Sequence, residues 1–253
     1  MLLDFVTFVD YINGMLKLDI LAFAAHPDDV ELTCAGTLLQ AIKQGKRVGI
    51  VDLTGGELGT RGSKELRAEE AKAASKVLGI VARENLGMKD GFFQNSEENQ
   101  LSVIRMIRKY QPEIILCNTP SDRHPDHGRA SAMVSTSVFL ARLPKIITSV
   151  DGVQQEAWQT RAVYHYIQDR HLRPDFVFDV TDVWEQRMEA VKCYSSQFYN
   201  PESREPETPI SSKLFWEFLD ARAREFGKSI GVKYAEGFLV ERVPGVKDLF
   251  QLY

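Results

Sequence analysis

The chain has 253 residues, of which 44% are hydrophobic, so its length suits one α/β domain, or at most two small ones, around a sizeable core. It carries 31 Lys and Arg against 35 Asp and Glu, a formal charge of -4, and no block of basic residues forms the stripe that nucleic-acid binding usually needs. Composition therefore argues against a disordered chain and a nucleic-acid partner, and it favours a small-molecule partner.

The cysteines and the apolar runs indicate the cellular compartment of the protein. Cys34, Cys117 and Cys193 are isolated and odd in number, which fits neither a disulfide framework nor a paired-cysteine zinc site. No apolar run approaches the ~20 residues of a membrane span, and the first residues lack the basic region and cleavage site of a secretory signal. We expect reduced thiols and a cytoplasmic protein with no membrane partner. Residues 1–14 are interpreted either as a short N-terminal helix or as an extension ahead of a true start at Met15.

Strands and helices are predicted to alternate along the first half of the chain. Residues 18–25 form a nearly continuous apolar run, which is typical of a parallel strand buried on both faces. After a polar loop, we predict a helix over 34–44, a strand over 47–53, a glycine-rich loop over 55–62 and a helix over 65–78. Gly45 and Gly79 follow the two helices, where glycine commonly ends a helix.

The second half continues the alternation and then weakens. Ser96 is a predicted N-cap for a helix that ends before Pro112. We further predict strands over 114–118, 162–168, 176–180 and 234–240, and helices over 129–140, 182–194 and 211–226. This order predicts a single α/β domain over residues 1–253, with a Rossmann-like, doubly wound, mostly parallel sheet and helices on both faces.

Two loops at the carboxyl ends of predicted strands have similar sequences, His26-Pro-Asp-Asp29 and His124-Pro-Asp-His127. In open α/β sheets such loops line the ligand crevice. A catalytic zinc takes three protein ligands from imidazole nitrogen and carboxylate oxygen and leaves a fourth position for water. The residues His26, Asp29 and His127 could supply that set.

The remaining carboxylate of the first loop, Asp28, would then stand beside the metal without binding it, where a general base for water is needed. A second interpretation stays open for each loop alone, since carboxylates before a helix also cap its backbone N–H groups. Three of the five histidines lie in the two loops together, which favours the metal site. Glu31 either orients a metal ligand or is a surface carboxylate, and no chemistry is assigned to His165 or His171.

Three motifs occur in one order along the predicted sheet. They are Ala-His-Pro-Asp-Asp-Val-Glu over residues 25–31, Gly-Glu-Leu-Gly-Thr-Arg-Gly over 56–62 and His-Pro-Asp-His over 124–127. In this combination the chain resembles the PIG-L/LmbE-like family of zinc-dependent N-acetylglucosaminide deacetylases from about residue 18 to residue 240. It is most similar to the bacillithiol-pathway branch, which deacetylates N-acetylglucosaminyl malate, because residues 194–198 and 234–238 also resemble that branch.

The resemblance implies a Rossmann-like, LmbE-like fold and assembly into homo-oligomers, often hexamers. It implies zinc ligation by His26, Asp29 and His127, the base role for Asp28, and an electrostatic or acid role for His124. Iron(II) could occupy the same ligands. In the mechanism that follows, Asp28 takes a proton from a water acidified by zinc, and protonated His124 helps zinc to stabilise the tetrahedral oxyanion. Either Asp28 or His124 then protonates the amine leaving group.

Three further residues are assigned to the site on weaker patterns. Asp126 could hydrogen-bond an imidazole of its own loop and fix its tautomer, with Arg161 as a third member or substrate-binding residue. Arg161 could equally be a surface arginine beside a strand. Arg61 lies in the glycine-rich loop, where its guanidinium could grip a sugar hydroxyl or a substrate carboxylate, although such loops are often merely turns.

We therefore predict a zinc-dependent N-deacetylase that acts on a small N-acetylglucosaminide, with N-acetylglucosaminyl malate of bacillithiol biosynthesis as the expected substrate. The alternatives are a deacetylase of an inositol or chitooligosaccharide conjugate and a non-catalytic sugar-binding homologue. A phosphoesterase would favour a second metal and more carboxylates than the two loops offer. A zinc peptidase of the His-Glu-x-x-His type is excluded because that spacing is absent.

Overall fold

The computed structural model describes residues 16–251, so the predicted N-terminal extension over residues 1–14 lies outside the described residues. The first half contains β1 (Ile20–Ala24), α1 (Asp29–Thr33), α2 (Ala35–Lys43), β2 (Val48–Thr54), α3 (Lys64–Leu78), β3 (Ala82–Met88), α4 (Glu97–Tyr110) and β4 (Ile114–Asn118). The second half contains α5 (Pro125–Ala141), β5 (Ser149–Val150), β6 (Val153–Gln154), β7 (Ala162–Tyr166), β8 (Phe176–Asp179), η2 (Thr181–Val183), α6 (Trp184–Lys192), α7 (Lys213–Lys228), β9 (Ala235–Val240) and η3 (Leu249–Gln251).

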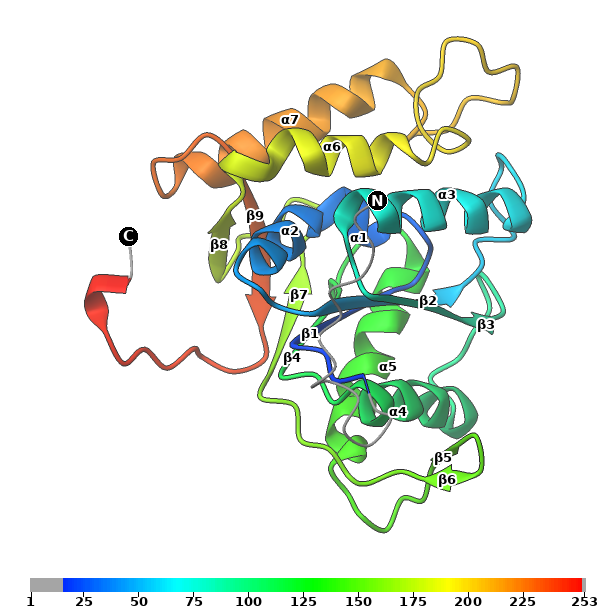
Figure 1. Ribbon diagram of the computed structural model, residues 1–253. Coiled ribbons are helices and arrows are strands. Elements are labelled where there is room, and N and C mark those ends of the chain that lie inside the picture. The colour runs from blue at the N-terminus through cyan, green and yellow to red at the C-terminus, as the bar shows by residue number, and fades with distance from the viewer. Residues whose placement is uncertain (1–15, 252–253) are drawn as a thin grey trace, which may run out of the picture.

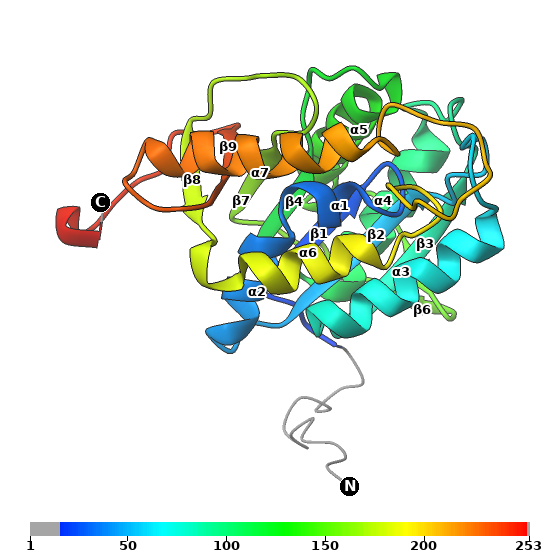
Figure 2. The same cartoon turned by 90° about the horizontal axis from the view of Figure 1, so that it is seen from above.

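The central feature is a seven-stranded sheet with the order β3-β2-β1-β4-β7-β9-β8 (Figure 1). The pairs β2–β3, β1–β2, β1–β4 and β4–β7 are parallel, whereas β9 runs antiparallel to both of its neighbours. Helices cover both faces of this sheet, as the view from above also shows (Figure 2). The predicted fold class, a doubly wound and mostly parallel α/β sheet, is confirmed.

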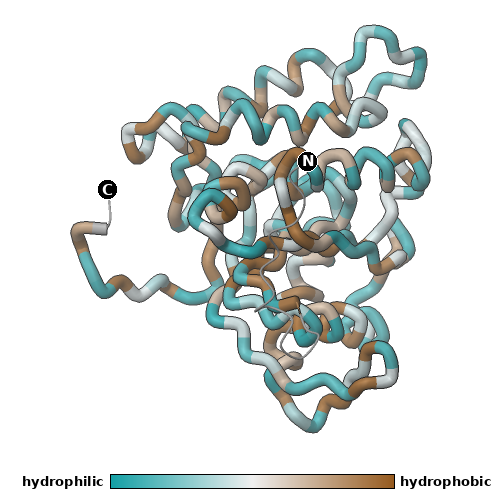
Figure 3. Tube along the Cα trace, in the orientation of Figure 1, coloured by the Kyte–Doolittle hydropathy of each residue, from teal (hydrophilic) through white to brown (hydrophobic). Residues whose placement is uncertain are grey.

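The central strands are buried on both faces, which explains their continuous apolar sequences. Every residue of β1 and β2 is buried. Because side chains alternate across a strand, Ile20, Ala22 and Ala24 join the core that includes α2 and α6, while Leu21 and Phe23 join the core that includes α4 and α5. The hydrophobic colouring accordingly gathers along the inner strands and alternates along the outer helices (Figure 3).

Local capping residues fix the ends of the longer helices. The hydroxyl of Ser96 accepts a hydrogen bond from the backbone N–H of Asn99, which confirms the predicted start of α4. Ser63 does the same for α3, and Gly79 ends that helix with a φ of 73° in the left-handed region. These boundaries follow from chemistry that is local in the sequence.

Several elements differ from the prediction, among them the short strands β5 and β6, which were not predicted. Strand β3 was not predicted, because its sequence Ala-Arg-Glu-Asn-Leu-Gly-Met has no apolar run; it is an edge strand whose Arg83 pairs with Asp52 of β2. The short helix α1 occupies residues that were predicted as loop. Helix α5 begins at Pro125, four residues earlier than predicted, because proline is well suited to the first turn of a helix.

The strand order places the two histidine loops side by side. From β1 the chain moves to β2 and then β3 on one side, and it later returns to β4 on the other side of β1. This reversal is a topological switch point, where the loops at the carboxyl ends of adjacent parallel strands diverge and leave a crevice. The loop after β1 and the loop after β4 border that crevice. A bilayer-spanning helix, which needs both length and an apolar surface, does not occur between residues 16 and 251.

Candidate active site and metal centre

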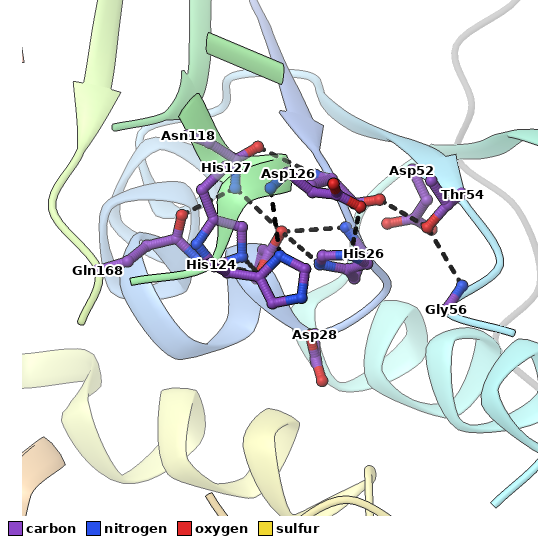
Figure 4. A network of polar contacts seen from close by, with 12 residues as sticks. His26, Asp28, Asp52, Thr54, Gly56, Asn118, His124, Asp126, His127 and Gln168 are labelled. Atoms are coloured by element: carbon purple, nitrogen blue, oxygen red, sulfur yellow. Dashed lines mark hydrogen bonds and ion pairs between the residues drawn. The ribbon is translucent and has the colours of Figure 1, made fainter. Parts of the chain in front are cut away.

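Three imidazoles converge at the switch point, one from the loop after β1 and two from the loop after β4 (Figure 4). The ring centroid of His26 lies 4.6 Å from that of His124 and 5.6 Å from that of His127. One ring nitrogen from each imidazole lies within 4.8 Å of the others. The sequence therefore brings side chains that are about 100 positions apart into one cluster suited to a metal ion.

The carboxylate of Asp29 lies between two of these imidazoles. Its Oδ1 is 3.2 Å from Nε2 of His127, and its Oδ2 is 3.7 Å from Nδ1 of His26. All three side chains are buried. Burial by itself would raise the pKa of Asp29, but the neighbouring His127 and His26 hold it well below its ordinary value. The structure thus brings the three predicted metal ligands together.

Asp29 is held in this position by hydrogen bonds from three elements. Nδ2 of Asn118, at the end of β4, donates to Oδ2 at 2.9 Å, and Nε2 of Gln168, just after β7, donates to Oδ1 at 2.9 Å. The backbone N–H of His26 donates to Oδ2 at 3.0 Å. Neither amide was predicted from the sequence, because an isolated Asn or Gln at a strand end has no distinguishing pattern.

A second set of carboxylates orients the histidines. Nε2 of His26 faces Asp90 at 3.1 Å and Asp126 at 3.4 Å, and Nδ1 of His127 lies 2.5 Å from Asp122. The opposite nitrogens, Nδ1 of His26 and Nε2 of His127, are the ones that face Asp29. Carboxylates that bind the outer nitrogen of a ligating histidine fix its orientation and raise its basicity.

The role expected for Asp126 is corrected by this geometry. We expected its carboxylate to fix an imidazole of its own loop, but Oδ2 lies against His26 of the other loop and accepts a hydrogen bond from the backbone N–H of Gly91 at 2.8 Å. The reason is that Asp126 is the second residue of α5, and its helical backbone directs the side chain across the crevice. Asp126 is therefore a residue that positions His26.

The electrostatics of the cluster favour a cation. Burial alone would lower the pKa of His127, but Asp29 and Asp122 raise it to about 9. The pKa of His26 is also raised well above its ordinary value, against the effect of burial, by hydrogen bonds to Asp126, Asp29 and Asp90. The surrounding carboxylates thus attract positive charge to the space between the rings. Two imidazole nitrogens and one carboxylate oxygen form the donor set of a catalytic zinc, so these residues fit a divalent metal.

Asp28 is buried but does not share the ligand cluster; in Figure 4 it stands apart from the dashed network. Its backbone has a φ of 128°, a conformation that residues other than glycine rarely adopt. Its Oδ2 accepts a hydrogen bond from Arg67 at 3.1 Å. Burial raises the pKa of Asp28 to about 7, although Arg67 acts in the opposite direction. A carboxyl group that titrates near neutral pH can both accept and return a proton.

His124 differs from our expectation in its charge. Burial and the neighbouring His26 and His127 lower its pKa to about 4, so the imidazole is neutral at pH 7 rather than protonated. Its Nδ1 accepts a hydrogen bond from the backbone N–H of Asp126 at 3.2 Å as the N-cap of α5. The proton of the neutral ring is consequently on Nε2, which makes this nitrogen a hydrogen-bond donor.

The imidazoles and Asp28 line a cavity of about 280 Å³ between the two loops and α7. Several polar side chains on its wall were not singled out from the sequence; they are Arg67, Asp90, Arg123, Gln168, Asp169, Gln197 and Arg222. Asp90 follows the unpredicted strand β3, and Arg67 lies on the polar side of a helix where sequence alone indicates a solvated face. A cavity of this size suits a sugar ring together with part of its substituent.

Arg61 is near the cavity but does not line it. Its guanidinium contacts the carbonyl oxygen of Phe198 at 3.4 Å, the hydroxyl of Ser203 and the carboxylate of Glu205 at 3.7 Å. These contacts fasten the loop after β2 to the segment that precedes α7. The geometry therefore gives Arg61 a structural role in this loop and does not support the substrate contact that we expected.

Arg161 is placed at the opposite edge of the sheet. It directly precedes β7, at the amino end of that strand, and its side chain is 66% exposed beside Glu113. The metal cluster lies at the carboxyl ends of the strands. Arg161 consequently contacts neither Asp126 nor the cavity, and the role expected for it has no support in the structure.

The other residues considered from the sequence have structural partners. Glu31 is fully buried and bonds Arg83 at 2.6 Å and Tyr194 at 3.1 Å, so it does not orient a metal ligand directly. His165 is buried, with Nδ1 2.8 Å from the carbonyl oxygen of Asn118 and Nε2 3.1 Å from Glu241. The side chain of His171 is 74% exposed. The interpretation of both histidines as lacking chemistry stays a prediction.

Comparison with known proteins identifies similar sequences along most of the chain. Residues 21–138 match the family model described as PIG-L, GlcNAc-PI de-N-acetylase. A diacetylchitobiose deacetylase from Thermococcus kodakarensis is 30% identical over 240 residues, which cover 90% of this chain and 84% of the relative. A 4-oxalmesaconate hydratase from Pseudomonas putida is 26% identical over 196 residues, which cover 70% of this chain and 73% of the relative.

Solved structures share the architecture as well. The conserved protein TT1542 from Thermus thermophilus has a TM-score of 0.80 and 34% sequence identity, covering 91% of this chain and 98% of that protein. The structural match therefore includes most of the C-terminal third of this chain. The fold is also shared with N,N'-diacetylchitobiose deacetylase from Pyrococcus horikoshii, at a TM-score of 0.74, and with a hydratase from Pseudomonas putida, at a TM-score of 0.73.

Proposed function

Because this chain belongs to the PIG-L/LmbE-like family of deacetylases, we propose that it is a zinc-dependent hydrolase that removes the N-acetyl group from an N-acetylglucosaminide. One observation supports the proposal above all others. The three donor side chains of His26, Asp29 and His127 converge beside Asp28, a cavity-lining carboxylate that lies outside the ligand set. Deacetylation needs both features, a Lewis acid and a separate proton acceptor.

The proposed metal ligands are Nδ1 of His26, a carboxylate oxygen of Asp29 and Nε2 of His127. When bound, zinc supplies Lewis-acid chemistry that polarises the acetamide carbonyl and makes water more acidic. The protein's part is to hold these donors in place, since Asp122 fixes the ring of His127 and Asn118 fixes the carboxylate of Asp29. The metal is proposed from the donor set, which iron(II) would also fit.

Asp28 is the proposed base. Its carboxylate accepts a proton from water as the water oxygen forms a bond to the acetamide carbon. The C–N bond then breaks, and Asp28 returns its proton to the departing amine, so that the products are acetate and a free amino sugar. The hydrogen bond from Arg67 keeps Asp28 directed into the cavity and limits how far burial raises its pKa.

His124 is the proposed oxyanion donor. Its neutral ring carries the proton on Nε2, because Nδ1 accepts the N–H of Asp126. A neutral imidazole that donates a hydrogen bond stabilises negative charge as it develops on the carbonyl oxygen, without a counter-charge in the ground state. This assignment replaces the protonated His124 that the sequence led us to expect.

The proposed substrate is N-acetylglucosaminyl malate, on the resemblance to the bacillithiol-pathway branch. The relative from T. kodakarensis is named for a different N-acetylglucosamine conjugate, diacetylchitobiose. Both share the same acetamide on the same sugar, so the chemistry proposed above serves either one. The test is therefore a panel assay of acetate release from the malate, inositol and chitobiose conjugates, with zinc and iron measured in the same preparation.

The assay has clear outcomes. Acetate release from at least one conjugate by metal-loaded protein, with the highest kcat/KM for the malate form, supports the proposal. Metal-loaded protein that releases no acetate from any conjugate contradicts it. Because one relative is named as a hydratase, the same preparation is incubated with 4-oxalmesaconate, and loss of its double bond without deacetylation would place the chain with that branch.

A further inference from the structure

The cavity wall contains three arginines, and their pairing differs. Arg67 bonds Asp28 at 3.1 Å, and Nε of Arg123 bonds Asp169 at 3.2 Å. Arg222, on α7, has a buried Nη1 with no hydrogen-bond partner among residues 16–251. A buried N–H group without a partner loses its hydration and gains nothing in exchange. Nε of Arg67 is likewise buried without a partner, but its Nη2 bonds Asp28. Among the described residues, Arg222 is therefore the lining arginine that forms no hydrogen bond or ion pair.

The nearest carboxylates do not satisfy Arg222. Asp169 and Asp122 act on its pKa through charge, but neither forms a hydrogen bond or ion pair with it in the described part of the chain. Asp122 is already engaged, since Oδ2 bonds His127 and Oδ1 accepts the backbone N–H groups of Arg123, Asp169 and Arg170. The carboxylate of Asp169 bonds Arg123. In the observed conformation, neither carboxylate reaches Arg222 with a hydrogen bond or ion pair.

On α7, Arg222 has apolar side chains beside it as well as the charged groups described above. Phe215, Leu219 and Arg222 follow one another at helical spacing and line the same cavity. Arg222 also borders a second, smaller cavity whose wall includes none of the imidazoles. The guanidinium thus lies where the site continues beyond the metal cluster. Apolar neighbours exclude water there, and a hydrogen bond from a charged group is stronger for that reason.

We propose that Arg222 forms a binding subsite for the aglycone of the substrate, in which its guanidinium donates hydrogen bonds to an oxygen of that group. The inference rests on the proposed deacetylase function and deepens it. The acetamide must lie at Asp28 and His124, so the remainder of the conjugate extends along the cavity toward α7. A guanidinium with an unpartnered Nη1 donates a stronger hydrogen bond to a carboxylate than to a sugar hydroxyl.

The consequence is a preference among conjugates of the same sugar. A carboxylate-bearing aglycone gains a charge-assisted hydrogen bond at Arg222, whereas a neutral disaccharide or inositol gains an ordinary one. The carboxylate oxygen of one aglycone and the hydroxyl oxygen of the other can both accept a hydrogen bond from Arg222. Substrates that differ only in the aglycone therefore show which of the two oxygens Arg222 prefers.

The test compares Arg222→Gln with the wild type on N-acetylglucosaminyl malate and on diacetylchitobiose. We expect kcat/KM for the malate conjugate to fall by about 10- to 100-fold, mainly through KM, and kcat/KM for chitobiose to fall by less than about 5-fold. Arg222→Lys should recover part of the loss on the malate conjugate, because it keeps the charge but not the planar fork. The matched control is Arg224→Gln, on the same helix but bonded to Asp220 and Tyr234 outside the cavity.

A binding measurement keeps the subsite separate from catalysis. Calorimetric titration with glucosaminyl malate, the amine product, should show a Kd about 10-fold or more weaker for Arg222→Gln than for the wild type. This result would support the subsite even if the wild type released no acetate, in which case the proposed function alone would fail. Equal losses on both substrates, unchanged binding of the product, or a loss in kcat accompanied by a lower Tm would each overturn the subsite and give Arg222 a purely structural role.

Discussion

The chain uses the tripeptide His-Pro-Asp twice, at adjacent strand ends, and the two copies do different work. In the first copy Asp28 faces the cavity with a strained backbone at a φ of 128°. In the second copy Asp126 is an ordinary helical residue, fully buried, whose carboxylate bonds the Gly91 backbone and Arg129 and contacts His26. The same three residues thus have different surroundings in the two loops, in line with the proposed roles of Asp28 as a proton acceptor and Asp126 as a residue that positions His26.

The difference comes from the helices that follow. Helix α5 has 17 residues and starts at Pro125 with His124 as its cap, so Asp126 takes helical dihedral angles. Helix α1 has only five residues and no side-chain cap, and Asp28 lies just outside it. A non-helical Asp28 turns its carboxylate away from the ligand cluster. Backbone context, rather than the local sequence, therefore decides which of the two carboxylates lines the cavity.

The first prediction removes a metal ligand from the second loop. His127→Ala should lose the metal, because Nε2 of His127 is one of three proposed donors, and deacetylation should fall to background. Metal content measured by mass spectrometry together with acetate release tests this. His165→Ala is a control, since it also removes a buried histidine but one outside the cluster. Stoichiometric metal in His127→Ala would remove that residue from the ligand set.

The second prediction concerns the first carboxylate of the comparison. Asp28→Asn should lower kcat by about 100-fold or more while the metal content stays near that of the wild type, because an amide cannot accept the proton. The substitution keeps the shape of the side chain and its contact with Arg67. Steady-state kinetics with metal analysis on the same sample provide the measurement. Full activity in this variant would refute the base assignment.

The third prediction replaces Asp126, the aspartate of the second His-Pro-Asp copy, by asparagine. Asp126→Asn should weaken metal binding by about 10- to 100-fold, the usual effect of removing a carboxylate behind a ligating histidine. Excess metal should then restore most of the activity, which it should not do for Asp28→Asn. Metal titrations of the two variants side by side test the contrast. If Asp126→Asn instead kept its metal and lost kcat, the two copies would not have divided roles.

The sequence predicted the parts of this site that depend on local chemistry. The buried strands β1 and β4 were apparent as apolar runs, and the loops that follow them contain the histidines. The ligand set His26, Asp29 and His127 could be proposed because the parallel strand order places such loops at one edge of the sheet. The elements with strong local signals, such as the Ser96 cap, were found for the same reason.

The parts that could not be predicted depend on contacts between distant segments. Asp90 comes to His26 only because the polar edge strand β3 pairs with β2, and Gln168 comes to Asp29 across 139 positions. The neutral state of His124 follows from burial and neighbouring charges, which no spacing reveals. Arg61 and Arg161 were predicted to bind substrate but do not line the cavity, because neither a motif nor a strand end indicates the direction of a long side chain.

The helices that follow the two histidine loops are also stabilised at their starts in different ways. Helix α5 is capped locally by His124, whereas the N–H groups that start α2 are bonded by Glu236 of β9, about 200 positions away. Burial raises the pKa of Glu236, so the charged form is less favourable in the folded protein than in the unfolded chain.

A raised pKa in the folded state means that the stabilising contribution of Glu236 is largest at low pH and declines as the pH rises through that pKa. Glu236→Gln, which stays neutral, should therefore cost about 1 kcal/mol of unfolding free energy near pH 5 and less near pH 8. Urea unfolding of both proteins at the two pH values measures the difference, with the exposed Glu217→Gln as background. A cost that is constant, or that grows with pH, would show that the ionised carboxylate is not disfavoured at this cap. The start of α2 would then depend on a long-range contact that does not weaken as the pH rises.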